Sequence, residues 1–433
     1  MSSRNRELLA LLPASLLLAG GFAAVFIQNS EKLSTLSLSY AAIYLGLCLA
    51  GHVVVRITVP NADPYMFPVV AVLCSIGLVV IYRIDVDLAR AQAQWFVVAL
   101  IFFAATLVFL RDYRKLERYR YTIAAVSLGL LLLPRVPGIG QQANGAFLGV
   151  RLPGGMVFQP TEFAKIGIVI FLASYLRDTR QLLVQGGRTI AGITIPRIKH
   201  LGPLLLIWGA AMLMLIFIRD LGSSLMFFGG FLAVLYVATG KVSFPFVGLL
   251  LFAIGAWFLG THVGHVHDRV DAWLNPFDPV LYNRPGGSYQ LAQSVFAQAD
   301  GGLLGKGLGA SILGLPGGGT LVPAPQTDLI YSVITDELGL TGACGVLLCY
   351  LLFVARGFKA ATVARDSFST LLAAGLTAVF ALQVFVIVGG VTRVIPLTGV
   401  TLPFISYGGS SLVANFVLLA LLLLVSDRAR RPA

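Results

Sequence analysis

The residues whose types and spacing best suit chemistry are a few ionisable side chains set among long apolar stretches. Glu162 and Lys165 lie three positions apart in the run Gln-Pro-Thr-Glu-Phe-Ala-Lys at 159–165. Pro160 suits the first turn of a helix, and a spacing of three places both charges on one face of that helix. Such a pair either fixes helix packing or lines a polar cavity. Charges at membrane depth are costly enough to suggest a function.

Three more charged residues stand at the ends of apolar runs, and each allows two interpretations. Asp328 follows Pro325-Gln326-Thr327. It either caps the next helix or, if a cavity desolvates it and raises its pKa, acts as a general base. Asp220 lies in a short turn, where it caps the following helix or contacts a ligand. Arg393 either snorkels to the membrane interface or binds a phosphate.

The segment from Pro396 to Ser411 is the most specific feature of the sequence. Prolines, glycines and hydroxyls, Ser406 among them, interrupt an otherwise apolar region. Irregular backbone at membrane depth persists only where protein or a wet cavity satisfies its polar groups. The segment therefore predicts a binding site.

Other kinds of chemical site are not indicated. The sequence has no pattern typical of a Ser-His-Asp triad, a phosphate-binding Walker loop or a zinc site. His262, His265 and His267 cluster, but no further ligand residues complete a metal-binding pattern, so we expect no metal site there. The four cysteines lie in apolar stretches and are interpreted as small buried hydrophobes.

The elements that must position these residues are membrane helices. Of 433 residues, 57% are apolar and 12% are charged, and the mean hydropathy is +0.87. Soluble domains carry about 25% charged residues, so an ordinary cytosolic enzyme is excluded. A transmembrane helix needs roughly 20 apolar residues. The sequence predicts an all-α polytopic membrane protein with about twelve transmembrane helices, near 8–27, 37–55, 67–84, 93–110, 121–134, 160–176, 203–218, 223–239, 244–261, 338–355, 369–390 and 401–425.

The net charge of +12 predicts an orientation and not a nucleic-acid partner. With the N-terminus in the cytoplasm, about two thirds of the basic residues fall in cytoplasmic segments, as the positive-inside rule requires. Both termini are then cytoplasmic. The segment 262–335 becomes a long loop on the outer face, in which Tyr289–Asp300 is expected to form an amphipathic helix on the bilayer surface.

These motifs jointly resemble the SEDS family (shape, elongation, division and sporulation), whose members are of the RodA, FtsW and SpoVE types. Pro396–Ser411 is similar to the family signature, and 159–165 resembles its "QPSELAK". Further likenesses follow in the family's order: Asp220–Ser224 to "DLGTA", Asp278–Ser294 to "DPxxxxGYQxxQS", Gly302–Gly309 to "GGLxGKGxG", and Pro325–Gly339 to "HTDFxFxxxxEELG". The sequence departs from the family pattern at Gln326, Ser288 and Phe147–Leu148.

The resemblance implies a fold and a division of the chain. The family has a ten-helix core, which would start here at the run 67–84. Residues 1–60 are then a two-helix N-terminal addition, 61–427 the core with its outer loop 262–335, and 428–433 a basic cytoplasmic tail. The extra helices, together with Asp366–Phe368 and Val388–Arg393, resemble RodA-type proteins of actinobacteria.

The resemblance also implies an activity. SEDS proteins polymerise lipid II into β-1,4 glycan strands outside the bacterial cytoplasmic membrane. The family's catalytic aspartate maps onto Asp328, and its intramembrane pair onto Glu162 and Lys165. Lys165, Lys306, Arg393 or a bound divalent cation would offset charge on the leaving diphosphate; no other cofactor is indicated. The residues expected to contact substrate are Glu162, Lys165, Asp220, Gln290, Gln293, Ser294, Lys306, Arg393 and Ser406.

Partners and alternatives follow from the same resemblance. It implies a class B penicillin-binding protein, a transpeptidase, as protein partner, besides lipid II and membrane lipid. A lipid II flippase or transporter is the competing class, since a charged pair and a broken helix also suit a translocation path. An FtsW-type division polymerase and a scaffold that only recruits a transpeptidase are the remaining alternatives. The long outer loop with a carboxylate at its end favours the enzyme.

Overall fold

The structure is a computed structural model of the whole chain. It describes residues 3–28, 35–143, 146–151, 157–185, 188–190, 193–195, 202, 205–206, 208–210, 212–213, 220–262, 264–284, 286–312 and 320–431. Within these residues, nine helical segments are long and apolar enough to cross a membrane. The prediction of a polytopic helical membrane protein is thereby confirmed.

The described helices follow the predicted apolar runs closely. The runs at 121–134 and 160–176 form helices that are shorter or more charged than the nine spans, and the run at 203–218 lies mostly outside the described residues. The helices are α1 (Ser3–Ala10), α2 (Leu12–Gln28), α3 (Thr35–Thr58), α4 (Met66–Ile84), α5 (Val86–Phe109), α6 (Lys115–Arg118), α7 (Arg120–Leu132), α8 (Pro160–Gln185), α10 (Leu221–Thr239), α11 (Ser243–His262), α12 (Gly264–Leu274), α13 (Pro279–Asn283), α14 (Tyr289–Gly301), α15 (Ile330–Val363), α16 (Ser367–Val391) and α17 (Gly409–Arg430).

Two small antiparallel sheets were not predicted from the sequence. Strands β1 (Gly140–Ala143), β2 (Ala146–Arg151) and β3 (Val157–Phe158) form one, in the order β1-β2-β3. This sheet directly precedes α8, so it helps to position the start of that helix. Strands β4 (Arg188–Ile190) and β5 (Ile193–Ile195) form the other.

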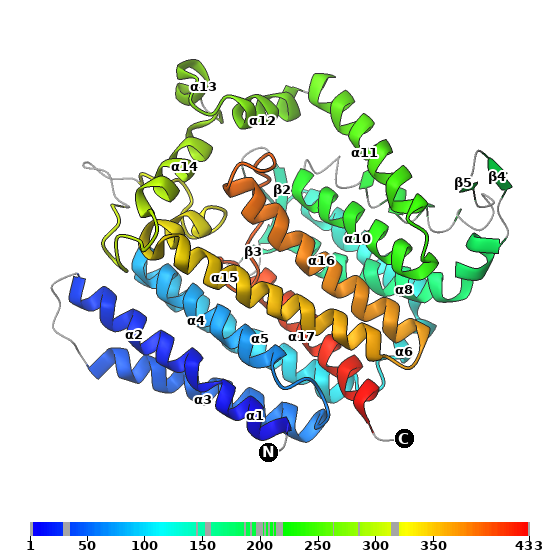
Figure 1. Cartoon of the computed structure of the whole chain (residues 1–433), viewed down its shortest axis with the longest axis horizontal. Coiled ribbons are helices and arrows are strands. Elements are labelled where there is room, and N and C mark those ends of the chain that lie inside the picture. The colour runs from blue at the N-terminus through cyan, green and yellow to red at the C-terminus, as the bar shows by residue number, and fades with distance from the viewer. Residues whose placement is uncertain are drawn as a thin grey trace.

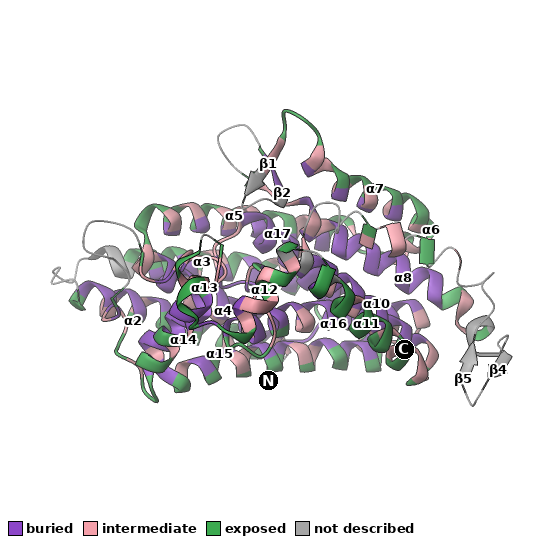
Figure 2. Ribbon diagram, turned by 90° about the horizontal axis from the view of Figure 1, so that it is seen from above, coloured by how far each residue is buried: buried purple, intermediate pink, exposed green. Residues whose placement is uncertain are grey.

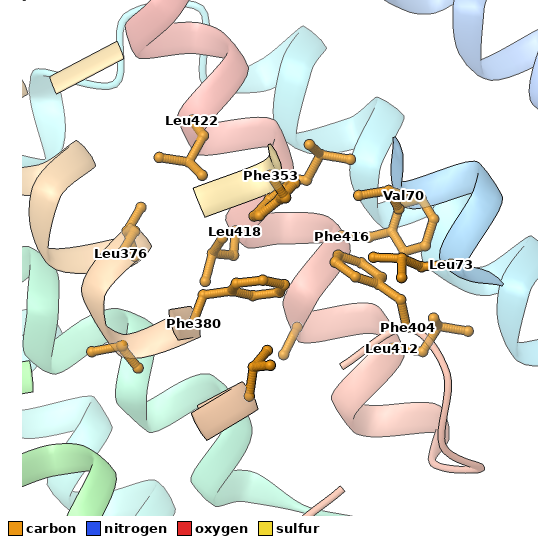
Figure 3. Close-up of a cluster of buried hydrophobic side chains, with 14 of the residues drawn as sticks. Val70, Leu73, Phe353, Leu376, Phe380, Phe404, Leu412, Phe416, Leu418 and Leu422 are labelled. Atoms are coloured by element: carbon orange, nitrogen blue, oxygen red, sulfur yellow. The ribbon is translucent and has the colours of Figure 1, made fainter. Parts of the chain in front are cut away.

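The helix α17 is at the centre of the bundle. In the most apolar 18-residue stretch of α17, 94% of the residues are buried. In the same stretch of α5, which packs beside α17, the share is 39%. Figure 2 shows the same contrast, with buried residues on α17, α16 and α4 and exposed ones along α5 and α7. Aromatic rings fill the interior: Phe416 of α17 makes edge contacts with Phe96, Phe103 and Phe404. Figure 3 shows this core, to which α4, α15 and α16 also contribute.

The predicted outer loop is largely helical. Helices α12, α13 and α14 lie together beyond one end of the bundle, while both chain ends lie near the other (Figure 1). The predicted helix at 289–300 is confirmed by α14, which packs against α15 and buries Leu291, Ala292 and Ala297. One face of α14 is therefore covered by protein and not by a membrane surface.

A kink in α15 receives the glycine-rich segment after α14. Gly339 has φ +68°, and a Cβ there would lie 2.3 Å from the backbone nitrogen of Gly305. Such contact excludes any side chain, and the positive φ favours glycine. The backbone amides of Lys306 and Gly307 donate to the carbonyls of Asp336 and Glu337, at 3.0 and 2.9 Å. The glycines of 302–309 thus join the outer segment to the helix that follows Asp328.

Aspartates begin several of these helices. Asp85 accepts hydrogen bonds from the amides of Asp87 and Leu88 at the start of α5, and Asp366 accepts one from Ser369 at the start of α16. Each such cap satisfies backbone donors that a helix leaves open.

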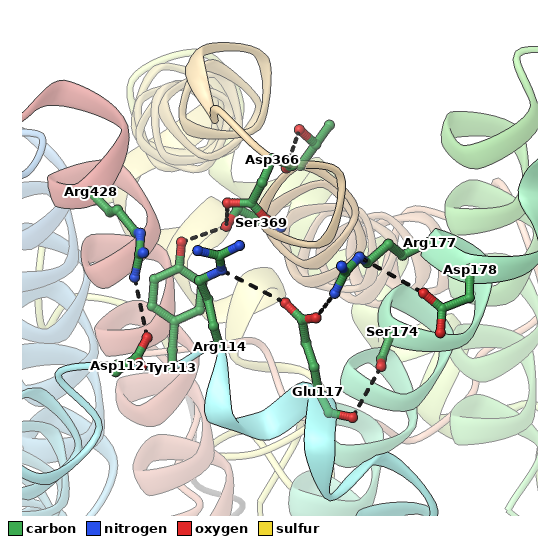
Figure 4. A network of polar contacts seen from close by, with 11 residues as sticks. Asp112, Tyr113, Arg114, Glu117, Ser174, Arg177, Asp178, Asp366, Ser369 and Arg428 are labelled. Atoms are coloured by element: carbon green, nitrogen blue, oxygen red, sulfur yellow. Dashed lines mark hydrogen bonds and ion pairs between the residues drawn. The ribbon is translucent and has the colours of Figure 1, made fainter. Parts of the chain in front are cut away.

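The end of the bundle that holds both chain termini carries a network of charged residues. Glu117 pairs with Arg177, and Arg428 pairs with Asp112 at 3.2 Å (Figure 4). Asp63, fully buried, pairs with Arg430 at 2.6 Å and Arg356 at 3.3 Å. Basic residues near the C-terminus are therefore bound to the segments that connect α3 to α4 and α5 to α6.

Candidate functional site

A polar pocket of about 40 Å³ opens where the starts of α8 and α10 meet the irregular segment before α17. Arg269 of α12 bonds to the carbonyls of residues 397 and 398 in this segment, and α12 lies at the end of the bundle away from the chain termini (Figure 1). Three of the predicted site features supply the walls of the pocket: the charged pair, the turn at Asp220 and the broken segment. Its lining residues are Gln159, Thr161, Glu162, Asp220, Ser223, Gly399, Val400 and Thr401.

The predicted pair of Glu162 and Lys165 forms in the first turn of α8. Lys165 Nζ donates to Glu162 Oε2 at 2.5 Å, and both side chains are buried. The two residues differ in position: Glu162 lines the pocket, whereas Lys165 is not among its lining residues. The pair therefore sits in the pocket wall with its carboxylate toward the pocket.

Asp220 both caps a helix and faces the pocket. Its carboxylate accepts hydrogen bonds from the Ser223 amide at 2.9 Å and the Ser223 hydroxyl at 2.6 Å. Burial raises the pKa of Asp220, an effect that the Ser223 bonds oppose and the nearby Glu162 charge reinforces. The two roles that the sequence left open are therefore compatible with each other.

Asp328 lies beside the pocket in the turn that precedes α15. A Cβ built on Gly399 would stand 3.4 Å from Asp328 Oδ2, so this carboxylate faces the pocket-lining segment. Burial raises the pKa of Asp328 from 3.8 to about 6, although a nearby Arg269 charge and a Thr327 hydrogen bond oppose the rise. A carboxyl with this pKa is mostly ionised at neutral pH and is basic enough to accept a proton.

Arg269, on α12, is a site residue that the motifs did not single out. Its positive charge lowers the pKa of both Asp328 and Asp220. Its guanidinium bonds weakly, at 3.4 Å, to the carbonyls of Leu397 and Thr398. No carboxylate of the described residues lies within 4 Å of it, so it is the least neutralised cation beside Asp328. The only sequence signal was its place in the outer loop, where charge serves many purposes.

The irregular segment 396–408 is tied to the turn that carries Asp328. The Ser406 hydroxyl donates to the carbonyl of Thr327 at 2.7 Å, and the amide of Tyr407 donates to the carbonyl of Gln326 at 2.8 Å. Ser406 thus positions the backbone next to Asp328. The left-handed φ values of Ala324 and Phe404, 45° and 68°, fall in these same segments, where strain often marks functional geometry.

Arg393 lies in a second cavity, of about 330 Å³, with residues 274–278. Its guanidinium donates to the carbonyls of Trp273 and Leu274 at 2.9 and 2.7 Å, and the indole of Trp273 donates back to the Arg393 carbonyl at 3.1 Å. The side chain joins the end of α12 to the end of α16, and it is not among the residues that line the first pocket.

Four further predicted substrate contacts lie on or after α14, outside the pocket lining. Ser294 is fully buried between Ser332 and the carbonyl of Val391, at 2.7 and 3.0 Å. Gln293 donates to the Tyr282 hydroxyl at 2.7 Å, and Gln290 is exposed.

Lys306 is ion-paired with two carboxylates. It lies 2.9 Å from Asp300 and 3.1 Å from Asp336. Burial lowers the pKa of Lys306, but its bonds to these two carboxylates outweigh burial, and the net change is a rise. The arrangement joins the segment after α14 to α15 and neutralises the charge of this lysine.

The described residues do not assemble a site for a divalent cation. No group of three or more His, Cys, Asp or Glu within them could hold one. His267 lies 3.2 Å from Asp271, and His262 contacts backbone and hydroxyl oxygens. The side chain of His265 lies outside the described residues.

Known proteins are similar to this chain in sequence. The family model for FtsW, RodA and SpoVE, described as cell cycle protein, matches residues 64–431. The peptidoglycan glycosyltransferase RodA of Mycobacterium tuberculosis H37Rv is 40% identical, with 99% of this chain and 92% of that protein covered. Stage V sporulation protein E of Bacillus subtilis is 30% identical, with 86% and 98% covered.

Two solved structures are similar in fold as well. A chain of a peptidoglycan synthase complex, described for its coordination of polymerization and crosslinking, gives a TM-score of 0.66 at 28% identity, with 86% of this chain and 99% of that chain covered. The rod shape determining protein RodA of Thermus thermophilus gives 0.60 at 27% identity, with 86% and 98% covered. The match over 64–431, the mycobacterial likeness along nearly the whole chain and these shared folds place this protein in the FtsW/RodA/SpoVE family.

Proposed function

We propose that this chain is a peptidoglycan glycosyltransferase that polymerises lipid II into β-1,4 glycan strands on the outer face of the cytoplasmic membrane. The relatives at 38 to 40% identity carry the name peptidoglycan glycosyltransferase RodA. The single observation that carries the proposal is the Asp328 carboxylate, desolvated to a pKa of about 6 and set against the wall of a polar pocket.

Asp328 is proposed as the general base. The reaction joins the 4-hydroxyl of one lipid-linked sugar to the anomeric carbon of another, and the diphosphate leaves with the bonding electrons. An α-linked diphosphate becomes a β-glycosidic bond, so the anomeric centre inverts in one displacement. One base must accept the hydroxyl proton, and a carboxylate with a pKa of about 6 suits that step near neutral pH.

The leaving diphosphate needs positive charge beside it. Lys306 is neutralised by two carboxylates, and the Arg393 guanidinium is occupied by backbone carbonyls. Arg269 lies near Asp328 and pairs with no described carboxylate, and an arginine fork matches phosphate oxygens. We assign the diphosphate contact to Arg269. Lys165 supplies a second positive charge, but it pairs with Glu162 and does not line the pocket.

The orientation and the division of the chain belong to the same proposal. Both termini are cytoplasmic, which puts the basic network of Figure 4 inside and the pocket outside. Residues 1–60 are an addition of two membrane spans, the first formed by α1 and α2 and the second by α3, to a core that begins near residue 61, close to the start of the family match at 64. The role is elongation or shape, since mycobacterial RodA is the most similar relative named above.

The proposed protein partner is a class B penicillin-binding protein. The similar chain in a synthase complex described for polymerization and crosslinking supports a transpeptidase beside this chain. The activity should therefore be measured both with and without that partner.

The test is polymerisation of purified lipid II by the protein in liposomes, read as glycan strands on a gel. We expect Asp328→Asn to bind lipid II and to lose activity by about 10²–10⁴-fold, the usual contribution of a general base. Arg284→Gln is the matched control, because Arg284 pairs with Asp268 at 3.0 Å in the outer loop. Undiminished polymerisation by Asp328→Asn would remove Asp328 from this role, and lipid II translocation without polymerisation by the wild type would favour a flippase.

A further inference from the structure

A buried glutamine in the middle of α16 connects the charged pair to the opposite wall of the pocket. Gln383 is fully buried, and it lies in an otherwise apolar stretch of the helix. Its Oε1 accepts a hydrogen bond from Lys165 Nζ at 2.6 Å, and its Nε2 donates to the carbonyl of Thr401 at 3.0 Å. A buried amide costs free energy unless both of its ends are bonded, and here both are.

The two bonds fix the orientation of the amide. Lysine is only a donor and a backbone carbonyl is only an acceptor. A flipped amide would direct its NH₂ group at the Lys165 ammonium and its oxygen at the Thr401 carbonyl, and would lose both hydrogen bonds. Gln383 can therefore bridge these two groups in one arrangement only.

The bridged groups stand on two sides of the pocket. Lys165 holds Glu162, which lines the pocket from α8, while Thr401 lines it from the irregular segment. A Cβ on Gly399, two residues before Thr401, would lie 3.4 Å from Asp328 Oδ2. A change at Gln383 is thus passed on in two directions, to the charged pair and to the wall that borders the proposed base.

Close helix packing holds Gln383 in place. α16 packs against both α8 and α10. A Cβ on Gly230 of α10 would lie 2.4 Å from Val379 Cγ2, and one on Gly229 would lie 2.8 Å from the end of the Leu382 side chain, so the two glycines favour this close approach. The backbone that carries Gln383 has little room to shift when its side chain is changed.

We propose that Gln383 is a positioning residue for the glycosyl transfer. Its two hydrogen bonds fix the Lys165 ammonium relative to Thr401 in the pocket wall. Gln383 does not line the pocket, so it acts through Lys165 and Thr401 and not on the substrate directly. The ammonium has three N–H donors, and Glu162 and Gln383 take two of them. This inference rests on the proposed function.

The test compares Gln383→Met with Gln383→Glu in the lipid II polymerisation assay. Methionine has a similar length and makes neither bond, so we expect kcat to fall about 10- to 100-fold per folded molecule, with a smaller change in KM. Glutamate keeps an oxygen for Lys165 and should recover part of that loss. Thr377→Val is the matched control: Thr377 is buried on the same helix, and within the described residues its hydroxyl donates to the carbonyl of Ala373 and to no other group.

The outcomes separate positioning from folding. An unchanged kcat per folded molecule for Gln383→Met, with only a lower melting temperature, would overturn the inference. Equal losses for the methionine and glutamate variants would overturn the part assigned to Lys165.

An inactive wild type would contradict the proposed function and not this inference. Binding of undecaprenyl diphosphate to the wild type and to Gln383→Met then decides the inference. A weakening of threefold or more supports it, and equal affinity overturns it.

Discussion

The raised pKa of Asp328 predicts how polymerisation depends on pH. If this carboxylate is the base and its pKa is about 6, about 9% of the protein is in the ionised form at pH 5 and about 97% at pH 7.5. The rate at pH 5 should therefore be about tenfold lower than at pH 7.5. With an ordinary pKa of 3.8, about 94% would be ionised at pH 5 and the rate would hardly change.

Loss of the fold does not explain this acid limb. The pKa of Asp328 is higher in the folded protein than the usual value of an unfolded chain, so the folded state binds more protons between about pH 4 and 6. Its contribution to stability is present at low pH and is lost as the pH rises through about 6. Protonation of Asp328 at pH 5 therefore stabilises the folded protein while it takes away the ionised carboxylate that the reaction needs.

The assignment to Asp328 is tested by changing the charge beside it. Arg269 lowers the pKa of Asp328, so Arg269→Gln should move the acid limb to higher pH, while Arg284→Gln should leave it in place. The assay is the initial rate of glycan formation from pH 4.5 to 8.5, with circular dichroism at each pH. A rate at pH 5 within twofold of that at pH 7.5, or an unmoved limb in Arg269→Gln, would refute the reasoning.

Three further changes test the pocket and its supports. Gly399→Ala places a Cβ 3.4 Å from Asp328 Oδ2 on a residue with φ +74°, so kcat should fall and the free energy of unfolding should drop by about 1–2 kcal/mol. Its control is Gly129→Ala, whose Cβ would meet no atom within 4 Å and which should cause neither loss. Lys165→Met leaves the buried Glu162 without its cation and should cost about 3–5 kcal/mol in thermal unfolding, most of it restored by a second change, Glu162→Gln. Gly339→Ala meets backbone at 2.3 Å and should lower the yield of folded protein strongly, whereas Gly345→Ala on the same helix should not.

Composition and apolar runs were sufficient to predict the fold class. Long apolar stretches have few alternatives in a bilayer, because only helices and closed barrels satisfy their backbone there. The small sheet before α8 could not be found this way, since its strands are short and pair locally. Nor could the kink at Gly339, which depends on the contact of Gly305 with a helix about thirty residues later in the chain.

The motifs predicted part of the candidate site, namely Glu162, Asp220, Asp328 and the broken segment. Ser294 and Lys306 belong to the same motifs, yet the structure bonds both of them to neighbouring helices. A motif shows which residue type stands at a position, but it does not show whether that residue packs within the fold or contacts substrate. Arg269 and Gln383 escaped notice for the opposite reason: their role comes from three-dimensional neighbours far away in the sequence.

The charged pair in α8 shows why its two sequence interpretations need not exclude each other. A buried ion pair is weak evidence for stability, because apolar residues of similar volume often stabilise a fold as well or better. Here the pair also engages a third buried polar group, Gln383, and that group engages the pocket wall at Thr401. A purely structural pair would gain nothing from Glu162 facing the pocket, where water competes for it. The bonds that fix the packing therefore also hold the Glu162 carboxylate in the pocket wall that it shares with Asp220, with the Lys165 ammonium bonded to it.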